Sequence, residues 1–425
     1  MVKYRIDRAL DSISNKIGII SSLNAIESLN GDPKCFNYSA LANAIYYNTY
    51  KIKARSCNSD ENNAILGTIG EALERYSACF YDYKEQIISD YNNLNQNAIN
   101  PQSFALFSKE QFFNKKFPFK YFDSDTVLSW FPTNDLTTGL ETYVPGQFIY
   151  MPFTKDKNIV TPNVSTGLAA HNNIYDAILN GLYEVIERDS FVLSWYQMIP
   201  LKKILIDENI RNYINKQILT ECQIYLFDIT TDLMIPSVLA LGFIENEFGK
   251  KFICGAATRW TYSEAIRKAL QEFIQAISIS RIQSKIMGSK RYKEFSDITS
   301  FDDHAWFYMN NPEYWGIFDN WFSSNTFKKV SFEEKDTITT KEKISKIVEI
   351  LAKKKYNVCV KDTTTIDLRQ LGYHSVKVVV PQLLPLSGNY NYYFLGGERL
   401  YTVPEKLGFK TKHYEGLNPY PHPFP

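Results

Sequence analysis

Two stretches of the chain carry the same string, Glu-x-x-Glu-Arg, inside segments with helical periodicity. The string comprises Glu71, Glu74 and Arg75 in the first stretch, and Glu184, Glu187 and Arg188 in the second. Residues three apart lie on one face of a helix, so each stretch would present two carboxylates one turn apart with an arginine beside them. One such string is typical of a solvated, salt-bridged helix surface, whereas its recurrence in two apolar surroundings indicates a shared role.

The four carboxylates predict a site for a divalent cation and a nucleotide. Carboxylates on helices with apolar flanks are costly to bury unless a positive charge neutralises them. Mg²⁺ typically combines carboxylates with nucleotide phosphates, and the forked guanidinium groups of Arg75 and Arg188 suit phosphate oxygens. A di-iron helix bundle would require Glu-x-x-His pairs, which this sequence lacks. The four glutamates are therefore the predicted metal ligands.

Three predicted helices must position these groups. Apolar residues recur at spacings of three and four over residues 64–80 and again from 174 to 186. A third segment of this kind, residues 263–279, carries Glu272 and Gln275 in largely apolar surroundings. All three helices thus offer a polar pair at positions i and i+3, where a core face would otherwise be expected.

A turn of small residues, Ser165-Thr166-Gly167, precedes the second helix and places Asn172 near its start, with Asp176 one turn on. The N-terminus of a helix offers unpaired N–H groups and a favourable dipole to an anion. Asn172 could equally serve only as the N-cap of the helix.

The predicted strands favour an α+β fold with mixed or antiparallel sheets. Strand-like runs at residues 223–229, 237–243 and 252–257, separated by turn residues, predict an antiparallel meander that leads into the third helix. This order differs from the regular alternation of a doubly wound parallel sheet. A Gly-x-Gly-x-x-Gly or Walker-type loop is absent, which excludes a Rossmann or P-loop nucleotide site.

The remaining sequence divides into an N-terminal segment, residues 1–50, and a catalytic unit, residues 51–425. We expect residues 1–50 to be helix-rich or irregular and to serve packing or partner contact. Residues 50–55 alternate like a strand. Residues 81–160 are expected to be loop-rich, with strand-like pieces at 142–145 and 147–151.

Two later segments also carry predictions. Residues 285–335, which include Trp306, Trp315 and Trp321, are expected to form an insertion or lid. The lysine-rich helix 340–355 and the strands 358–360 and 376–381 are expected to form an ordinary α/β edge with its charges in solvent.

Composition limits the classes of partner. Of 425 residues, 44% are apolar and 22% charged, as in soluble globular proteins. The net charge of +1 disfavours nucleic acid as a partner, and a signal peptide or a run of apolar residues long enough to span a membrane is not found. Six cysteines without a Cys-x-x-Cys suit free thiols in a cytoplasmic protein and disfavour a zinc site.

Taken together, four separated signatures resemble the YcaO-domain family, and within it the stand-alone azoline-forming cyclodehydratase of thiazole- and oxazole-modified peptide biosynthesis. The signatures are Gly70–Tyr76, Ala169–Asn172 continuing to Arg188–Asp189, Glu272–Gln275 and Pro419–Pro425. The resemblance extends from about residue 50 to the end. It implies a YcaO-like fold whose helices carry a buried site for ATP and Mg²⁺.

The resemblance also implies a reaction and further site residues. Such an enzyme converts Cys, Ser or Thr of a ribosomal precursor peptide into a thiazoline or oxazoline by phosphorylating the backbone amide oxygen with ATP. By resemblance, Glu272 is a further metal ligand, and Asn172, Asp176 and Gln275 contact the nucleotide. Arg281 could reach a phosphate or could lie on the surface. The loop 56–61 lacks the lysine that the family usually offers to the phosphates.

Residues 419–425 contain four prolines and favour an extended, stiff conformation. A disordered tail, or a ligand for an aromatic groove, would have the same composition. In azoline-forming members of the family this ending directs the terminal carboxylate into the active site. The resemblance therefore assigns Pro425 a catalytic role, as a positioning group or general base.

The resemblance implies partners as well. We expect an E1-like or other leader-recognition protein, possible association with a flavin-dependent azoline dehydrogenase, and an oligomeric enzyme. Two alternatives stay open: a YcaO enzyme that forms thioamides or amidines, and a non-catalytic peptide-binding scaffold subunit, which the missing loop lysine would suit.

Overall fold

Three β-sheets form the framework of the computed structural model, which describes residues 2–28, 32–44, 50–218, 222–288 and 290–424. The first sheet contains, in order, β1 (Ile20–Ile26), β2 (Phe36–Ala44) and β3 (Tyr50–Asn58). The second contains β11 (Gly249–Thr258), β10 (Ser237–Asn246), β9 (Cys222–Asp228), β8 (Lys202–Ile204) and β12 (Phe327–Lys328). The third contains β4 (Ile87–Ser89), β5 (Leu128–Asp135), β13 (Cys359–Asp362), β14 (His374–Val379) and β7 (Leu168–His171), with β6 (Leu140–Pro145) paired to β5.

These strands pair antiparallel, apart from the parallel pair β8 and β12. The longer helices are α1 (Val2–Leu10), α2 (Glu61–Ser77), α3 (Ile174–Gln197), α4 (Glu208–Gln217), α5 (Tyr262–Met287), α6 (Phe301–Asn310), α8 (Thr340–Lys353) and α10 (Glu398–Lys406), and the short ones are α7 (Asp319–Phe322) and α9 (Ile366–Gln370). The predicted α+β class with mixed and antiparallel sheets is confirmed.

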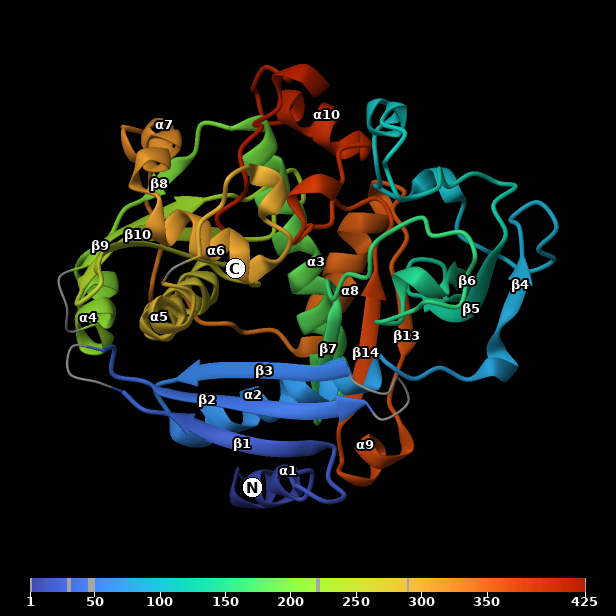
Figure 1. The fold of residues 1–425 in the computed structure, drawn as a ribbon, viewed down its shortest axis with the longest axis horizontal. Helices are drawn as coiled ribbons and strands as arrows, with labels where there is room; N and C mark the ends of the chain where they lie inside the picture. Colours follow the sequence, from blue (N-terminus) through green and yellow to red (C-terminus); the bar gives the residue numbers. More distant parts are fainter. Residues whose placement is uncertain (1, 29–31, 45–49, 219–221, 289, 425) are drawn as a thin grey trace.

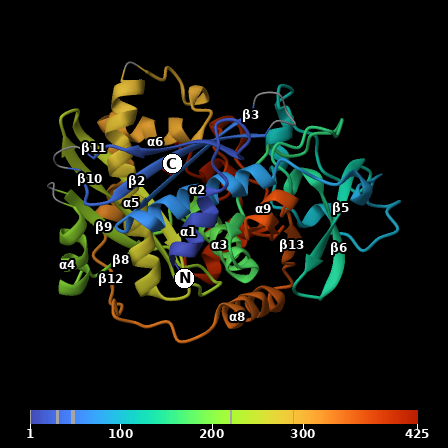
Figure 2. The same ribbon diagram turned by 90° about the horizontal axis from the view of Figure 1, so that it is seen from below.

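Three helices join the three sheets, and each of them contacts two (Figure 1). Helix α2 packs against β2 and β3 of the first sheet and β7 of the third, and α3 packs against β7 and β14 of the third sheet and β11 of the second. Helix α5 packs against β10 and β11 of the second sheet and β3 of the first. Figure 2, seen from below, shows α1 in front of α2, on the outer side of this junction. The three helices therefore meet where the sheets come together.

A polar side chain fixes the start of each of these helices. Asp60, Asn173 and Thr261 each accept a hydrogen bond from a backbone N–H in the first turn, at 2.9, 2.9 and 3.2 Å. Such caps satisfy N–H groups that have no partner inside the helix. The N-cap of α3 is thus Asn173, so the alternative role of Asn172 as the N-cap is wrong.

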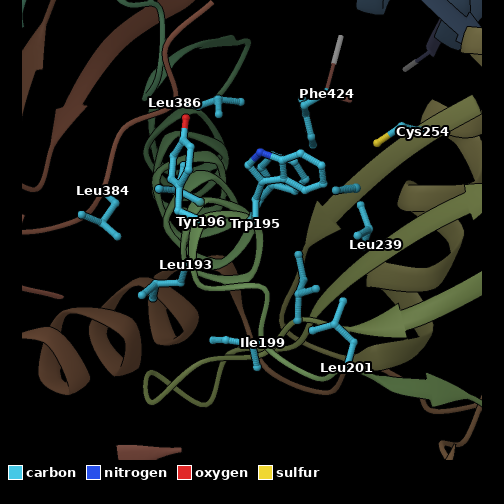
Figure 3. Close-up of a cluster of buried hydrophobic side chains, with 14 of the residues drawn as sticks. Leu193, Trp195, Tyr196, Ile199, Leu201, Leu239, Cys254, Leu384, Leu386 and Phe424 are labelled. Carbon is cyan, nitrogen blue, oxygen red and sulfur yellow. The ribbon is translucent and has the colours of Figure 1, made fainter. Parts of the chain in front are cut away.

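The largest core surrounds the C-terminal half of α3. Trp195 and Tyr196 of α3 pack with Leu239 and Cys254 of the second sheet and with Phe424 from the C-terminal segment (Figure 3). Residues near the end of the chain thus complete the core around α3. Within the described residues, none of the helices has the length and apolar character needed to cross a membrane.

The helices, the meander and the strand from Tyr50 were predicted correctly, but the N-terminal segment was not. Residues 1–50 were expected to be helix-rich or irregular, yet they contribute β1 and β2. These strands are rich in Ser, Asn and Ala, which weakens the apolar alternation by which strands are recognised. Because β2 pairs with β3, residues on either side of position 50 share one sheet.

Two segments are more deeply buried than the sequence indicated. The expected lid at 285–335 is wrong, since Trp306 and Trp321 are 2% and 0% exposed and belong to the interior. The aromatic residues of this segment complete the core and do not lie on a surface insertion.

The prediction of a strand at 147–151 is also wrong, because residues 146–148 form a 3-10 turn.

Helix α8 and the two strands near the C-terminus are present, but the expectation of an edge is wrong, because β13 and β14 lie inside the third sheet, between β5 and β7. Their charges are not all in solvent either. Helix α8 accompanies the antiparallel pair β13 and β14, as expected. Lys361 and Lys377, on these two strands, are only 9% and 3% exposed, so the expectation of solvated charges is wrong for them. A lysine in a central strand reaches solvent only when the face of the sheet from which it projects is uncovered.

Candidate active site

The glutamates predicted as metal ligands lie on the three helices that bridge the sheets. Glu71 and Glu74 are on α2, Glu184 and Glu187 on α3, and Glu272 on α5. In each pair, the spacing of three places both carboxylates on one side of the helix. The side chains of Glu184 and Glu272 keep 27% and 34% of their surface accessible, so these acids are reached by solvent.

Glu74 and Glu184 join α2 to α3 electrostatically. Burial raises the pKa of Glu74 well above its ordinary value, and the charge of Glu184 raises it further. Burial also raises the pKa of Glu184, although Arg188 and Lys377 oppose this change. One carboxylate raises the pKa of another only when the two are close. The facing acids of α2 and α3 therefore share one site.

Glu187 and Glu272 join α3 to α5 in the same way. Burial raises the pKa of Glu187 to about 7, with Arg188 opposing and the charges of Glu272 and Glu184 adding to the increase. Burial would also raise the pKa of Glu272, but the Lys268 ammonium, 2.9 Å from its carboxylate, lowers it overall. We refer to Glu74, Glu184, Glu187 and Glu272 below as the acid cluster.

Cations surround the acid cluster at unequal distances. Arg75 forms an ion pair with Glu71 at 2.7 Å and donates to the carbonyl oxygen of Lys53 at 3.0 Å. Arg188 lies 3.8 Å from Glu184 and 3.7 Å from Glu187, beyond hydrogen-bonding distance of either carboxylate. The buried Nη1 of Arg188 lacks a hydrogen-bond partner among the described residues. Arg188 is therefore the guanidinium with donors left to offer.

Backbone N–H groups hold two of the acids. The amide of Arg55 donates to Glu71 at 2.8 Å, and the amide of Gly167 approaches Glu184 at 3.4 Å. Gly167 has φ +87°, and a Cβ there would lie 2.1 Å from the carbonyl oxygen of Val378. Only glycine fits this position, so the small-residue turn before α3 is required to bring the chain past Glu184.

A family model described as the ATP- and Mg²⁺-binding YcaO cyclodehydratase matches residues 58–384, most of the chain. The chain belongs to the YcaO family. The match covers α2, α3 and α5 and thus all the glutamates predicted from the sequence. The family resemblance expected from the four sequence signatures is confirmed.

Solved structures share the YcaO fold. A heterocyclase in complex with substrate and cofactor superposes with a TM-score of 0.81 at 21% identity, over 100% of this chain and 57% of that one. YcaO from Methanopyrus kandleri, bound with AMPPCP and Mg²⁺, gives 0.63 at 17% identity over 90% of both chains. The Escherichia coli microcin synthetase McbBCD complex gives 0.57 at 17% identity, over 85% of this chain and 87% of that one. At these identities the similarity establishes the fold.

A curated relative from Rhizobium leguminosarum bv. trifolii, described as an uncharacterised protein in the tfuA 3′ region, is 26% identical over 175 residues. The aligned part is 38% of this chain and 41% of that protein. The chain therefore spans little more than half of the heterocyclase and less than half of the Rhizobium protein.

The other residues predicted for this YcaO site lie in separate surroundings. Asp176 accepts a hydrogen bond from Thr340 at 2.8 Å and lies 3.5 Å from His171, while Asn172 precedes the cap of α3. Gln275 is half-buried on α5, one turn from Glu272. Arg281 is engaged elsewhere, in ion pairs with Asp32 and Glu247. Pro425 lies outside the described residues.

Lys377 was not predicted as a site residue. Its ammonium is buried near Glu184 and Glu74, and it donates to the carbonyl oxygen of Val164 at 2.8 Å. Burial lowers the pKa of Lys377 to about 8, against the opposing influence of the two glutamates. The signal that could have revealed it is a lysine between the apolar residues Val376 and Val378 of a buried strand.

A cavity of about 1260 Å³ lies apart from the acid cluster. Tyr76, Tyr81, Ile178 and Val360 are among the residues that line it, whereas the acids of the cluster are not. On α2, Tyr76 projects from a different side of the helix than Glu74. The size of this cavity therefore does not identify it as the place of the predicted chemistry.

The donor set of the acid cluster fits Mg²⁺ and a nucleotide. Within the described residues, no group of three or more His, Cys, Asp or Glu side chains is close enough to enclose a metal ion. Mg²⁺ does not require such a cage, because it commonly takes one or two carboxylates together with phosphates and water. Buried acids with raised pKa values and the unpaired donor of Arg188 are the features that a cation and a phosphate would satisfy.

Proposed function

We propose that this YcaO protein is an ATP- and Mg²⁺-dependent cyclodehydratase that forms thiazolines or oxazolines in a ribosomal precursor peptide. The observation that supports this most strongly is the convergence of acids from α2, α3 and α5 at the junction of the three sheets. Such a concentration of carboxylates, with Glu187 buried and the others half-buried, opposes folding unless a ligand uses it.

The residues would divide the binding between cation and phosphates. Glu71, Glu74, Glu184, Glu187 and Glu272 would hold Mg²⁺, while Arg75, Arg188, Asn172, Asp176 and Gln275 would contact the nucleotide. Bound Mg²⁺–ATP would supply the phosphoryl group that turns the amide oxygen of the peptide into a leaving group. The protein contributes charge stabilisation and alignment, which dominate phosphoryl transfer.

In the proposed reaction the side-chain thiol or hydroxyl of Cys, Ser or Thr attacks the carbonyl carbon of the preceding residue. The carbonyl oxygen departs with phosphate, and loss of the amide proton leaves the C=N bond of the azoline. Pro425 would help by positioning the substrate or accepting a proton. The burial of Phe424, which is 1% exposed, supports a C-terminal segment that is directed inward.

We also propose that the enzyme works with a leader-recognition protein, E1-like or of another type, with possible association of a flavin-dependent azoline dehydrogenase, and as an oligomer. The heterocyclase with the same fold is almost twice as long as the part this chain covers, which leaves room for an additional recognition unit there.

The test is ATP turnover and product mass with precursor peptide, with and without a candidate partner. We expect loss of one water per ring in the wild type and no modification in a Glu184→Gln/Glu187→Gln variant. The matched control is Glu349→Gln, because Glu349 is an exposed glutamate of α8 that pairs only with Lys353 in the described structure. Equal turnover in the double variant would refute the assigned metal role.

The same assay separates the alternatives. A thioamide-forming enzyme would replace oxygen by sulfur and increase the peptide mass, and an amidine-forming enzyme would join an amine with loss of water. The loop between β3 and α2 lacks a lysine, which suits a scaffold subunit with an inactive site. A scaffold would bind peptide without Mg²⁺-dependent binding or turnover of ATP.

A further inference from the structure

The proline-rich segment 419–424 is held by a row of side chains. Four successive carbonyl oxygens, those of residues 419–422, face four different groups: Tyr390 (2.9 Å), Trp195 (3.2 Å), Tyr308 (2.7 Å) and His304 (2.9 Å), in that order. A polyproline backbone makes no internal hydrogen bonds, so its carbonyls are free to be recognised in this way. The four side chains of the row thus fix the segment in one position along its length, which we call its register.

A ring stack reinforces that register. His304 of α6 and His422 of the segment lie parallel, with ring centroids 3.7 Å apart and an angle of 5° between the planes. Both rings are completely buried, and burial lowers the pKa of His304 to about 3, so this imidazole is neutral. A contact between His422 Nε2 and the carbonyl oxygen of Ser387 at 2.8 Å fixes the edge of the His422 ring.

The register delivers Phe424 to the acid cluster. The guanidinium carbon of Arg188 lies 4.1 Å from the centre of the Phe424 ring, which also packs on Phe191 at 4.9 Å. Arg188 forms no hydrogen bond with Glu184 or Glu187, both of which are more than 3.5 Å away. An arginine stacked on an aromatic ring keeps its in-plane N–H donors available.

We propose that His304, Tyr308 and Phe424 are positioning residues, which hold the guanidinium of Arg188 by stacking and so leave its donors for a phosphate. The proposal rests on the proposed function in one respect, that the anion bound at Arg188 is a nucleotide phosphate. In this proposal the row of hydrogen bonds fixes the position of the segment 419–424 along these side chains, and the ring of Phe424 holds Arg188. Hydrogen bonds to an additional acid would have anchored Arg188 equally well but would have consumed those donors.

The test compares Phe424→Leu with Phe424→Tyr. Leucine keeps an apolar side chain but removes the ring face, whereas tyrosine retains it. We expect Phe424→Leu to raise the Kd of Mg²⁺ with a non-hydrolysable ATP analogue, measured by calorimetry, by roughly 3- to 30-fold. Tyrosine should restore the wild-type Kd to within about twofold. Because Phe424 is buried in the core, both variants are expected to lower the thermal midpoint, so the deciding readout is a Kd that follows the ring face and not the midpoint. With a structural role alone, the change in Kd would follow the midpoint and would not depend on the ring face.

Tyr308→Phe provides a second, independent variant, because it removes only the hydroxyl that holds the segment. We expect it to weaken nucleotide binding less than Phe424→Leu, and the double variant to be no weaker than Phe424→Leu alone, since both act through one contact. Tyr420→Phe is the control, because the Tyr420 ring packs on Phe295 and Tyr314, away from Arg188.

Arg188→Lys distinguishes failure of this inference from failure of the proposed function. Wild-type affinity in Phe424→Leu, together with weak binding in Arg188→Lys, would overturn the positioning role and leave the nucleotide site standing. Wild-type affinity in both variants would overturn the assignment of Arg188 to the nucleotide. Additive losses in the Tyr308→Phe/Phe424→Leu double variant would overturn the link between the row and the ring.

Discussion

Helices α2 and α3 carry the same Glu-x-x-Glu-Arg string, but their arginines have different surroundings. Arg75 of α2 pairs with Glu71 at 2.7 Å and donates to the backbone of Lys53. Arg188 of α3 lies within ion-pair distance of both glutamates of its own string, at 3.8 and 3.7 Å, but forms no hydrogen bond with either and stacks on Phe424. The arginine on α2 therefore makes hydrogen bonds within the protein, whereas the arginine on α3 keeps a buried donor, Nη1, without a hydrogen-bond partner among the described residues. An identical motif thus has different contacts in its two helices, which are set by the neighbours that the fold supplies.

The largest expected effect tests whether the acids of α3 are indispensable. Glu187→Gln removes the charge that burial and two neighbouring acids oppose, and with it a ligand for Mg²⁺. We expect ATP turnover to fall by about 100-fold or more, because weaker binding of Mg²⁺ deprives the phosphates of the positive charge that stabilises them during transfer. Turnover is measured as phosphate release, and thermal unfolding checks that the variant is folded. Turnover within a few fold of wild type would remove Glu187 from the site.

The next largest effect is on nucleotide affinity, and substitutions of the two arginines should change it to different extents. Arg188→Lys exchanges a forked donor for a point charge and should weaken nucleotide binding about tenfold. Arg75→Lys should change it by no more than about threefold, because Arg75 is already engaged by an ion pair at the edge of the site. Calorimetric titration of both variants makes the comparison. Equal losses would mean that α2 and α3 contribute their arginines alike.

The pH dependence of Mg²⁺ binding tests the role of α3 through Glu187. Because the pKa of Glu187 is raised to about 7, Mg²⁺ must displace its proton at lower pH. We expect Mg²⁺ affinity to fall by up to about tenfold per pH unit below 7 and to level off above it. Fluorescence or calorimetric titration from pH 5.5 to 8.5 measures this, and a flat profile would contradict the assignment of Glu187 as a ligand.

The stability of the protein without metal should change in the opposite sense. Between the ordinary value of 4.5 and about 7, the folded state holds a proton on Glu187 that the unfolded state has lost. The free energy of unfolding therefore falls as pH rises through that window and stays lower above it. Glu187→Gln should remove this part of the pH dependence and, above pH 7, should raise stability. Denaturant titration at pH 5 and pH 8 tests both statements.

The smallest expected effect concerns Arg281. Its ion pairs with Asp32 and Glu247 place it in a network of its own, so Arg281→Gln should leave nucleotide affinity within about twofold of wild type. The measurement is the same calorimetric titration. A clear loss of affinity would instead support the contact with phosphate that its position on α5 suggested.

The sequence revealed the parts of the site that obey local rules. The periodicity of α2, α3 and α5 and the spacing within Glu-x-x-Glu-Arg depend only on neighbours along the chain, so Glu74, Glu184 and Glu187 could be assigned together. The convergence of these residues could only be assumed, because it depends on how three helices pack between three sheets. The role of Asn173 as the cap of α3, one position after Asn172, shows how local competition between two like residues escapes such reasoning.

The residues that the sequence did not reveal depend on long-range contacts. Lys377 lies in a strand that reads as an ordinary edge, and only the third sheet brings it beside Glu184. Phe424 reaches Arg188 because α6, expected to be part of a lid, holds the C-terminal segment in the core. Strands β1 and β2 were missed because their small and polar residues become half-buried only when the sheet packs on α2.

The most direct measurement is calorimetric titration of the protein with a non-hydrolysable ATP analogue, with and without Mg²⁺, in the wild type and in Glu184→Gln/Glu187→Gln. We predict Mg²⁺-dependent binding at one site in the wild type, and its loss in a double variant that remains folded and at least as thermally stable. Mg²⁺-dependent binding of equal affinity in the double variant would show that the acids meeting between α2, α3 and α5 do not form the nucleotide site.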